Sequence, residues 1–224
     1  DAARGMQSPA HRIAHAGAVA ANSTDEPRRP TFSQPHAMKH MLAIDFGTSN
    51  STVGYPFDSG PALLPVEGSE LTVPSAIFFN DEEECAQFGR EAISAYTQHY
   101  EGRLLRALKS VLGHGLINEK TRIGDQQLTF KDIIALFIRH LKRQAEAKLE
   151  HSIDRVLLGR PVWFVVNDAQ RDQEAQDQLA SIAKSCGFSE VAFQYEPIAA
   201  ALDYESRVSR EELALIADLG GGTS

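Results

Sequence analysis

The stretch Met41-Leu-Ala-Ile-Asp-Phe-Gly-Thr-Ser-Asn-Ser-Thr-Val-Gly-Tyr55 reads as two strands joined by a tight polar turn. Leu42 and Ile44 alternate with smaller or polar residues before the turn, and Thr52 and Val53 are β-formers after it. The pattern predicts a β-hairpin, and the rest of the chain can be placed outward from it.

The turn of this hairpin has the composition of an anion-binding site. Gly47 can take the positive φ that a tight hairpin needs. The amides of Thr48, Ser49 and Asn50 can then point into one concavity and donate to an anion. Asp45 would stand at its mouth, where a carboxylate suits a hydrated Mg²⁺ beside a phosphate. The alternative is an ordinary polar hairpin without a ligand.

The far end of the chain repeats the pattern in Leu213-Ala-Leu-Ile-Ala-Asp-Leu-Gly-Gly-Gly-Thr-Ser224. An apolar strand leads to Asp218, three glycines and the hydroxyl of Thr223. No Gly-Lys-Ser/Thr follows, which excludes a Walker loop, and the consecutive glycines exclude the dinucleotide fingerprint. Two such turns indicate a pair of phosphate-gripping hairpins that face each other.

Composition limits the classes of function. The chain has 224 residues and 42% hydrophobic residues, enough for one large domain or two small ones. The formal charge of −8 argues against nucleic acid as a partner. No run of eighteen apolar residues predicts a membrane span. Cys85 and Cys186 have no metal-ligand spacing, and we expect free thiols in a reducing, cytoplasmic setting.

Residues 1–40 differ from the remainder because they almost lack large apolar side chains. We expect a disordered extension or translated sequence upstream of a start at Met38 or Met41. The Ala/Gly-rich stretch 14–21 is too weakly apolar for a signal peptide.

The sequence of the middle of the chain predicts short strands followed by helices. Residues 61–68 and 71–80 read as strands, and residues 91–112 as a helix with leucines at helical spacing. Residues 116–127 look irregular. Thr129-Phe-Lys-Asp132 is a capping-box variant that opens a long amphipathic helix.

The second half alternates strands and helices, which predicts an α/β fold with a mixed sheet. A buried strand covers residues 154–160, and Asn167 or Asp168 caps a helix that stops at Gly187. Residues 191–195 form the next strand. Glu196-Pro197 opens a further helix, and residues 213–217 form the strand that delivers Asp218.

With these residues in view, the chain resembles the nucleotide-binding domain of the DnaK-type heat-shock chaperones over residues 41–224. Residues 45–50 resemble the family's first phosphate motif, Asp-Leu-Gly-Thr-Thr-Asn, and residues 218–223 its second. Val73-Pro-Ser, Leu108-Lys-Ser-Val-Leu-Gly113, Arg160-Pro-Val-Trp-Phe with Asn167-Asp-Ala-Gln-Arg171, and Tyr195-Glu-Pro-Ile-Ala-Ala-Ala-Leu202 resemble further motifs in the family's order. The residues of these motifs resemble the YegD-like branch of the family most closely.

The resemblance implies an actin-like (ribonuclease H-like) ATPase fold with a mixed five-stranded sheet and flanking helices. Residues 41–75 and 127–212 would form the core subdomain of the first lobe, and 76–126 a trimmed outer subdomain. Residues 213–224 would begin a second lobe that is cut short, so we expect a fragment of a longer protein. Val165 and Val166 look like a two-residue insertion, relative to the family, before Asn167-Asp168.

The resemblance also implies roles for particular residues. ATP and Mg²⁺ would lie between the two hairpins, with unfolded polypeptides and co-chaperones as partners of the full-length protein. Asp45 and Asp218 would hold Mg²⁺ through its waters, and Lys109 would orient the attacking water. The implied catalytic residues are Lys109, Asp45, Asp218 and Thr223; the nucleotide contacts are Gly47, Thr48, Ser49, Asn50, Gly220, Gly221, Gly222 and Thr223; the relay between lobes is Pro161, Glu196 and Arg171.

Three other functions stay open on the sequence. An MreB-like filament protein shares the glycine turns and would sediment in the presence of ATP. A sugar kinase would need a catalytic aspartate in a sugar cleft. A pseudo-ATPase would bind nucleotide only as a switch.

Overall fold

The computed structural model describes residues 40–210 and 212–217. Residues 1–39 of the expected extension 1–40 and the second glycine turn predicted at residues 218–224 lie outside the described residues. Among the helices that are described, none is long and apolar enough to cross a membrane. Both cysteines are free thiols, Cys85 exposed and Cys186 buried.

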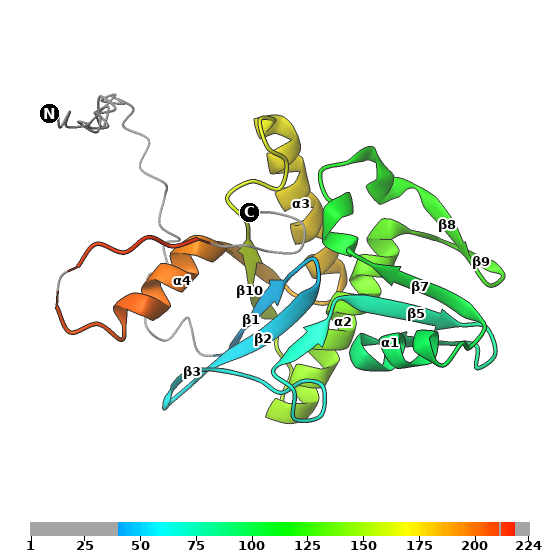
Figure 1. Ribbon diagram of the computed structural model, residues 1–224, viewed down its shortest axis with the longest axis horizontal. Helices are drawn as coiled ribbons and strands as arrows, with labels where there is room; N and C mark the ends of the chain where they lie inside the picture. The colour runs from blue at the N-terminus through cyan, green and yellow to red at the C-terminus, as the bar shows by residue number, and fades with distance from the viewer. Residues whose placement is uncertain (1–39, 211, 218–224) are drawn as a thin grey trace, which may run out of the picture. The chain divides into compact units, whose positions relative to one another are not determined.

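A six-stranded mixed sheet forms the centre of the fold (Figure 1). Its main row runs β11(Glu190–Tyr195), β10(Arg155–Arg160), β1(Met41–Phe46), β2(Asn50–Phe57) and β3(Gly60–Leu63). β10 is parallel to both β1 and β11, whereas β2 is antiparallel to β1. β4(Thr72–Pro74) also pairs with β2 and adds a short sixth strand to the expected five.

The predicted hairpin is therefore the middle of this sheet. Leu42, Ile44 and Phe46 of β1 are buried, and Val53 of β2 is fully buried beside them. The parallel neighbour β10 places Val156 and Leu158 in the same core. Alternation along β1 sends Asp45 to the opposite, exposed side.

Two long helices cover the core, and both begin where the sequence predicts. In α2(Phe130–Leu149), the Thr129 hydroxyl accepts from the Asp132 amide while Asp132 accepts from the Thr129 amide, a complete capping box. The Thr129 hydroxyl also donates to Asp132 Oδ2 at 2.6 Å, and this bond, together with that from the Thr129 amide, lowers the pKa of Asp132 below its ordinary value. In α3(Ala169–Ser185), the Asp168 side chain accepts from the Arg171 amide.

A second, three-stranded sheet corrects the helix predicted over residues 91–112. The helix α1(Gly89–Thr97) ends early, β7(Gly102–Arg106) follows, and residues 108–111 form one 3-10 turn, η2(Leu108–Val111). β7 pairs with β5(Ala76–Asn80), which also pairs with β6(Cys85–Phe88). Gly102 begins β7 with a φ of +151°, and a Cβ there would lie 2.1 Å from the Phe79 carbonyl oxygen, so this position requires glycine.

Residues 116–127 are more ordered than the sequence indicates. A 3-10 turn, η3(Gly115–Asn118), leads into a hairpin of β8(Lys120–Ile123) and β9(Gln126–Thr129). The turn between them carries Gly124 at a φ of +53°. The sequence did not predict these two strands because their residues are mostly polar and show no apolar alternation.

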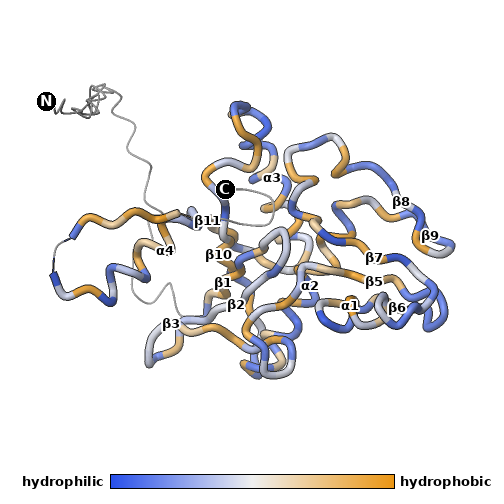
Figure 2. The backbone as a smooth tube through the Cα atoms, in the orientation of Figure 1, coloured by the Kyte–Doolittle hydropathy of each residue, from blue (hydrophilic) through white to orange (hydrophobic). Residues whose placement is uncertain are grey.

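The chain ends its described part with α4(Glu196–Glu205) and the extended residues 212–217. The strand predicted at residues 213–217 is not formed, because no described strand lies beside it to complete a ladder. Leu213 and Leu215 are fully exposed there, and Ile198 and Leu202 of α4 are exposed by about half. Figure 2 shows the hydrophobic character of this region.

Candidate functional site

The turn between β1 and β2 has the tight shape that the sequence predicts. Residues 47–49 join the strands, with Ser49 and Asn50 exposed and Gly47 and Thr48 partly buried. A Cβ on Gly47 would lie 2.1 Å from the Asn50 carbonyl oxygen, a separation that real side chains do not show. Gly47 does not have the positive φ that the sequence analysis expected; glycine is required here because the turn approaches itself closely.

A serine that the sequence analysis did not single out supports this turn. The Ser75 amide donates to the Ser49 carbonyl at 2.9 Å, and the Ser75 hydroxyl donates to the Gly47 carbonyl at 2.7 Å. Because that hydroxyl has one proton, the 2.8 Å contact between Ser51 and Ser75 must be donated by Ser51. Both serines are buried, so this chain of hydrogen bonds fixes the turn from inside the sheet.

Asp45 lies near Glu196 because a glycine separates them. Pairing of β1 with β10 sets Ile44 beside Leu158, and Gly159 is next on β10. The point where a Gly159 Cβ would stand is 3.4 Å from Asp45 Oδ1 and 3.5 Å from Glu196 Oε1. The two carboxylates thus approach one position at the carboxyl ends of two parallel strands.

Lys109 is a buried partner of Glu196 and not the surface lysine that its local sequence indicates. Its ammonium lies 2.8 Å from Glu196 Oε1, and its side chain is 6% exposed. Ala107, with a φ of 55°, links the end of β7 to the 3-10 turn that carries Lys109. The ammonium also lies 6.0 Å from the centre of the Phe164 ring. Asp45, Lys109 and Glu196 therefore gather around Gly159.

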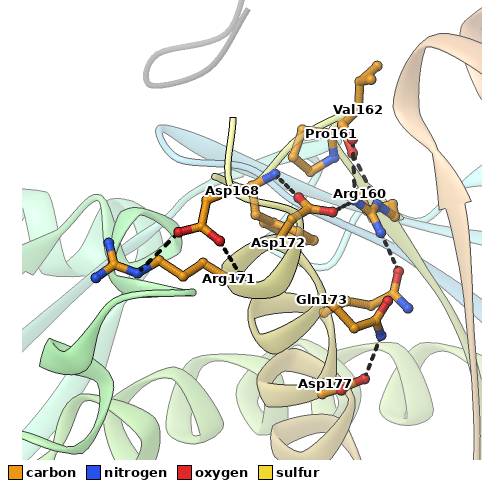
Figure 3. Close-up of polar contacts among 10 residues, drawn as sticks. Arg160, Pro161, Val162, Asp168, Arg171, Asp172, Gln173 and Asp177 are labelled. Atoms are coloured by element: carbon orange, nitrogen blue, oxygen red, sulfur yellow. Dashed lines mark hydrogen bonds and ion pairs between the residues drawn. The ribbon is translucent and has the colours of Figure 1, made fainter. Parts of the chain in front are cut away.

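The other two relay candidates lie on the neighbouring segment. Pro161 is buried directly after β10, and its carbonyl accepts from Arg160 Nε at 3.1 Å. Arg171 stands in the first turn of α3, where its guanidinium lies 3.6 Å from the Asp168 carboxylate (Figure 3). The structure joins Glu196 to Lys109 directly, while the recorded side-chain contact of Arg171 is with Asp168.

The second half of the predicted site cannot be placed. Asp218, Gly220, Gly221, Gly222 and Thr223 lie outside the described residues. Within residues 40–210 and 212–217, no three His, Cys, Asp or Glu side chains gather closely enough to cage a metal ion. A cavity of about 640 Å³ lies between α4 and residues 212–216, and none of the predicted phosphate or catalytic residues lines it.

The donor set that is described suits a triphosphate with a hydrated cation. Asp45 offers exposed carboxylate oxygens beside the tight turn, and Mg²⁺ usually binds through one or two carboxylates, water and phosphate. A fixed ammonium and a polar turn stand at the same end of the sheet. Together, the mixed sheet, its flanking helices and this turn have the architecture of the actin-like ATPase fold.

Comparison with known protein families identifies the group. A family model described as Hsp70 protein matches residues 41–224, and the chain belongs to the Hsp70 family. It is 32% identical over 187 residues to the chaperone protein DnaK of Thermosipho melanesiensis, which covers 83% of this chain and 29% of that protein. It is 34% identical over 186 residues to DnaK of Thermotoga petrophila, with 82% and 29% covered.

The matches bear on the competing functions. The chain spans 29% of the length of these relatives, so they support its assignment to the DnaK-type ATPase domain and not the activity of a whole protein. They do not favour the filament-forming alternative.

Proposed function

We propose that this chain is the ATP-binding and ATP-hydrolysing domain of a DnaK-type chaperone, with the nucleotide gripped between two glycine turns. The observation that carries the proposal is the buried Lys109–Glu196 pair, set beside Asp45 and the turn that Ser75 supports. Phosphoryl transfer to water depends mainly on positioning and charge, which these groups can supply.

Lys109 has the properties of a water-orienting residue. An ammonium has three N–H donors, and one of them is directed to Glu196. Two donors are then left for the attacking water and a phosphate oxygen. Burial keeps the charge from being screened by solvent, so it would act strongly on developing negative charge.

The turn residues would bind the phosphates. Thr48, Ser49 and Asn50 offer amides and polar side chains, and Gly47 keeps the turn tight. Bound Mg²⁺ would neutralise phosphate charge, and we assign Asp45 to hold its waters. Asp218 and Thr223, with glycines 220–222, would do the same from the opposite turn.

Glu196 is the relay residue with the strongest support. It touches Lys109, and it opens α4 with Pro197 in the first turn, so a shift of the helix would move the carboxylate. We assign Pro161 and Arg171 to the same relay because they flank the segment that leads from β10 to α3.

The proposal extends to the full-length protein. Its partners would be ATP or ADP, unfolded polypeptide clients and co-chaperones, and its setting the cytoplasm. We place it near the YegD-like branch. Residues 41–75 and 127–212 would be the core subdomain and 76–126 the outer one; the large sheet takes its strands from the first two ranges, and β5 to β8 come from the third.

The test is Lys109→Ala in the full-length protein. We expect ATP affinity within about threefold of wild type and a loss of single-turnover hydrolysis of roughly 10²–10³, because the ammonium acts in the transition state. Lys184→Ala, on an exposed part of α3, is the matched control and should leave both unchanged. Hydrolysis at the wild-type rate by Lys109→Ala would contradict the assignment. A second test uses residues 41–224 alone. We expect this fragment to bind ATP weakly, and tight binding would contradict the proposal that two glycine turns hold the nucleotide.

A further inference from the structure

Arg160 is a charged residue buried at the end of an apolar strand. Its side chain is 6% exposed, and Nη2 lies 2.7 Å from Asp172 Oδ2. Nε donates to the Pro161 carbonyl at 3.1 Å and Nη2 to the Val162 carbonyl at 3.3 Å, while Nη1 donates to Gln176 at 2.5 Å. Figure 3 shows the guanidinium between the loop backbone and α3. One side chain thus ties residues 160–162 to that helix.

Asp172, on α3, binds the same loop from the helix side. It stands in the first turn of α3 and is 7% exposed. One carboxylate oxygen pairs with Arg160, and the other accepts from the Phe164 amide at 2.6 Å. The segment from Pro161 to Phe164 is therefore held at both ends by a single buried ion pair.

The rings beside this ion pair lead to the candidate catalytic pair. The Arg160 guanidinium carbon lies 5.2 Å from the centre of the Phe164 ring and 4.8 Å from that of Tyr195. The Phe164 ring is also the one beside the Lys109 ammonium, and Tyr195 directly precedes Glu196. Movement of either ring would displace one member of the Lys109–Glu196 pair.

Stability alone does not account for a buried ion pair, because apolar residues of similar size often serve the fold as well. We propose that Arg160 and Asp172 are positioning residues that hold Phe164 and Tyr195 against the Lys109–Glu196 pair. This inference rests on the proposed ATPase function and deepens it.

The chain carries its own reporter for this loop. Trp163 is the single tryptophan, it lies between Val162 and Phe164, and it is 46% exposed. Acrylamide quenching of its fluorescence measures how well the loop is held, without any nucleotide. Single-turnover ATP hydrolysis by the full-length protein measures the effect on the candidate catalytic pair.

Four variants separate positioning from stability. Asp172→Asn and Arg160→Met each break the ion pair and should increase Trp163 quenching. Their hydrolysis should fall roughly 10- to 100-fold with ATP affinity within about threefold, as expected for misplaced groups. The double variant Arg160→Met/Asp172→Leu should regain thermal stability but not turnover. Arg155→Met, at the opposite end of β10 in an ion pair with Glu190, should change neither readout.

The outcomes distinguish this inference from the proposed function. If wild type hydrolyses ATP and Lys109→Ala does not, but Asp172→Asn keeps the wild-type rate, the positioning role is wrong and the ATPase assignment stands. Recovery of turnover together with stability in the double variant would likewise reduce the pair to a structural one. If wild type shows no Lys109-dependent hydrolysis, both proposals fail, whatever Trp163 reports.

Discussion

The ammonium of Lys109 donates a 2.8 Å hydrogen bond to Oε1 of Glu196, although 87 residues separate the two in the chain. Lys109 arrives on a 3-10 turn after the small sheet, and Glu196 arrives at the start of α4 after the large one. The bond therefore connects the segments that follow the six-stranded and the three-stranded sheets at the candidate site.

Glu196→Gln tests the value of this bond for stability. The amide keeps an acceptor but removes the negative charge, which leaves a buried ammonium without its counter-charge. We expect the free energy of unfolding to fall by about 1–3 kcal/mol in urea titrations followed by circular dichroism. Glu205→Gln, at the exposed end of the same helix, should be neutral. Equal stability of both variants would show that the pair is not held in solution.

Ser75→Ala tests the support of the phosphate turn. The change removes the hydrogen bonds to Gly47 and Ser51 and leaves the buried Ser51 hydroxyl without this acceptor. A loss of about 1–2 kcal/mol in unfolding free energy is expected, together with weaker ATP binding by the full-length protein. The control is Ser110→Ala, whose hydroxyl only bonds the nearby Ala107 carbonyl. Wild-type stability of the Ser75 variant would mean that the turn does not depend on it.

Gly47→Ala tests the close packing of the same turn. The new Cβ would meet the Asn50 carbonyl at 2.1 Å, so the backbone must move. We expect a cost of about 1–3 kcal/mol in thermal unfolding experiments, and ATP binding should weaken because the turn amides diverge. Gly115→Ala has nothing within 4 Å of its Cβ and serves as the control. Unchanged ATP affinity in the Gly47 variant would remove this turn from the site.

His140 makes stability sensitive to acid. Its ring stacks on Phe88 with centres 4.2 Å apart, and burial, with a smaller effect of Arg143, lowers its pKa from 6.5 to about 4. Between those values the unfolded chain binds more protons at this histidine than the folded one, so the contribution of neutral His140 to stability is fully present above pH 6.5 and is lost as the pH drops towards 4. The loss should be about 1–2 kcal/mol for a half-buried ring.

Urea titrations at several pH values check this prediction. His140→Gln cannot titrate and should flatten the profile between pH 6.5 and 4. His114→Gln, at an exposed position, should retain the wild-type profile. The same slope in the His140 variant as in wild type would assign the acid sensitivity to other groups.

Local chemistry made part of the fold predictable. The Thr129–Asp132 capping box and the stop at Gly187, which has a φ of +92°, depend on residues that are neighbours in sequence. The hairpin around Gly47 likewise follows from alternation and one glycine. In each case the signal and its cause lie within a few residues of each other.

The small sheet was not predictable in this way. Leu104, Leu105, Leu108 and Leu112 have helical spacing, yet Leu104 and Leu105 belong to β7 and face different cores. Their pairing with β5 reaches residues 76–80, and no local pattern encodes that contact. The predicted helix was correct over residues 91–97 and wrong beyond them, because long-range pairing overrode local propensity.

The candidate site shows the same division. The resemblance to known motifs selected Lys109 and Glu196, but the burial of Lys109 depends on a partner 87 residues away. Ser75 had a signal, since it ends the Val73-Pro-Ser motif, and its contact with the turn is again long-range. Arg160 also had a sequence signal, because it is a charged residue at the end of an apolar strand. Its partner Asp172 had none, since acidic residues are common in the first turn of a helix.

The placement of the two thiols has a practical consequence. Cys85 is exposed on β6 of the small sheet and Cys186 is buried after α3, so a maleimide dye will label one position in the folded protein. Partial desolvation and the neighbouring Glu83 carboxylate raise the pKa of this exposed thiol, so coupling should proceed faster in mildly alkaline buffer. With Trp163 as the energy-transfer donor, a dye on Cys85 would report relative motion of the three-stranded and six-stranded sheets without any engineered residue.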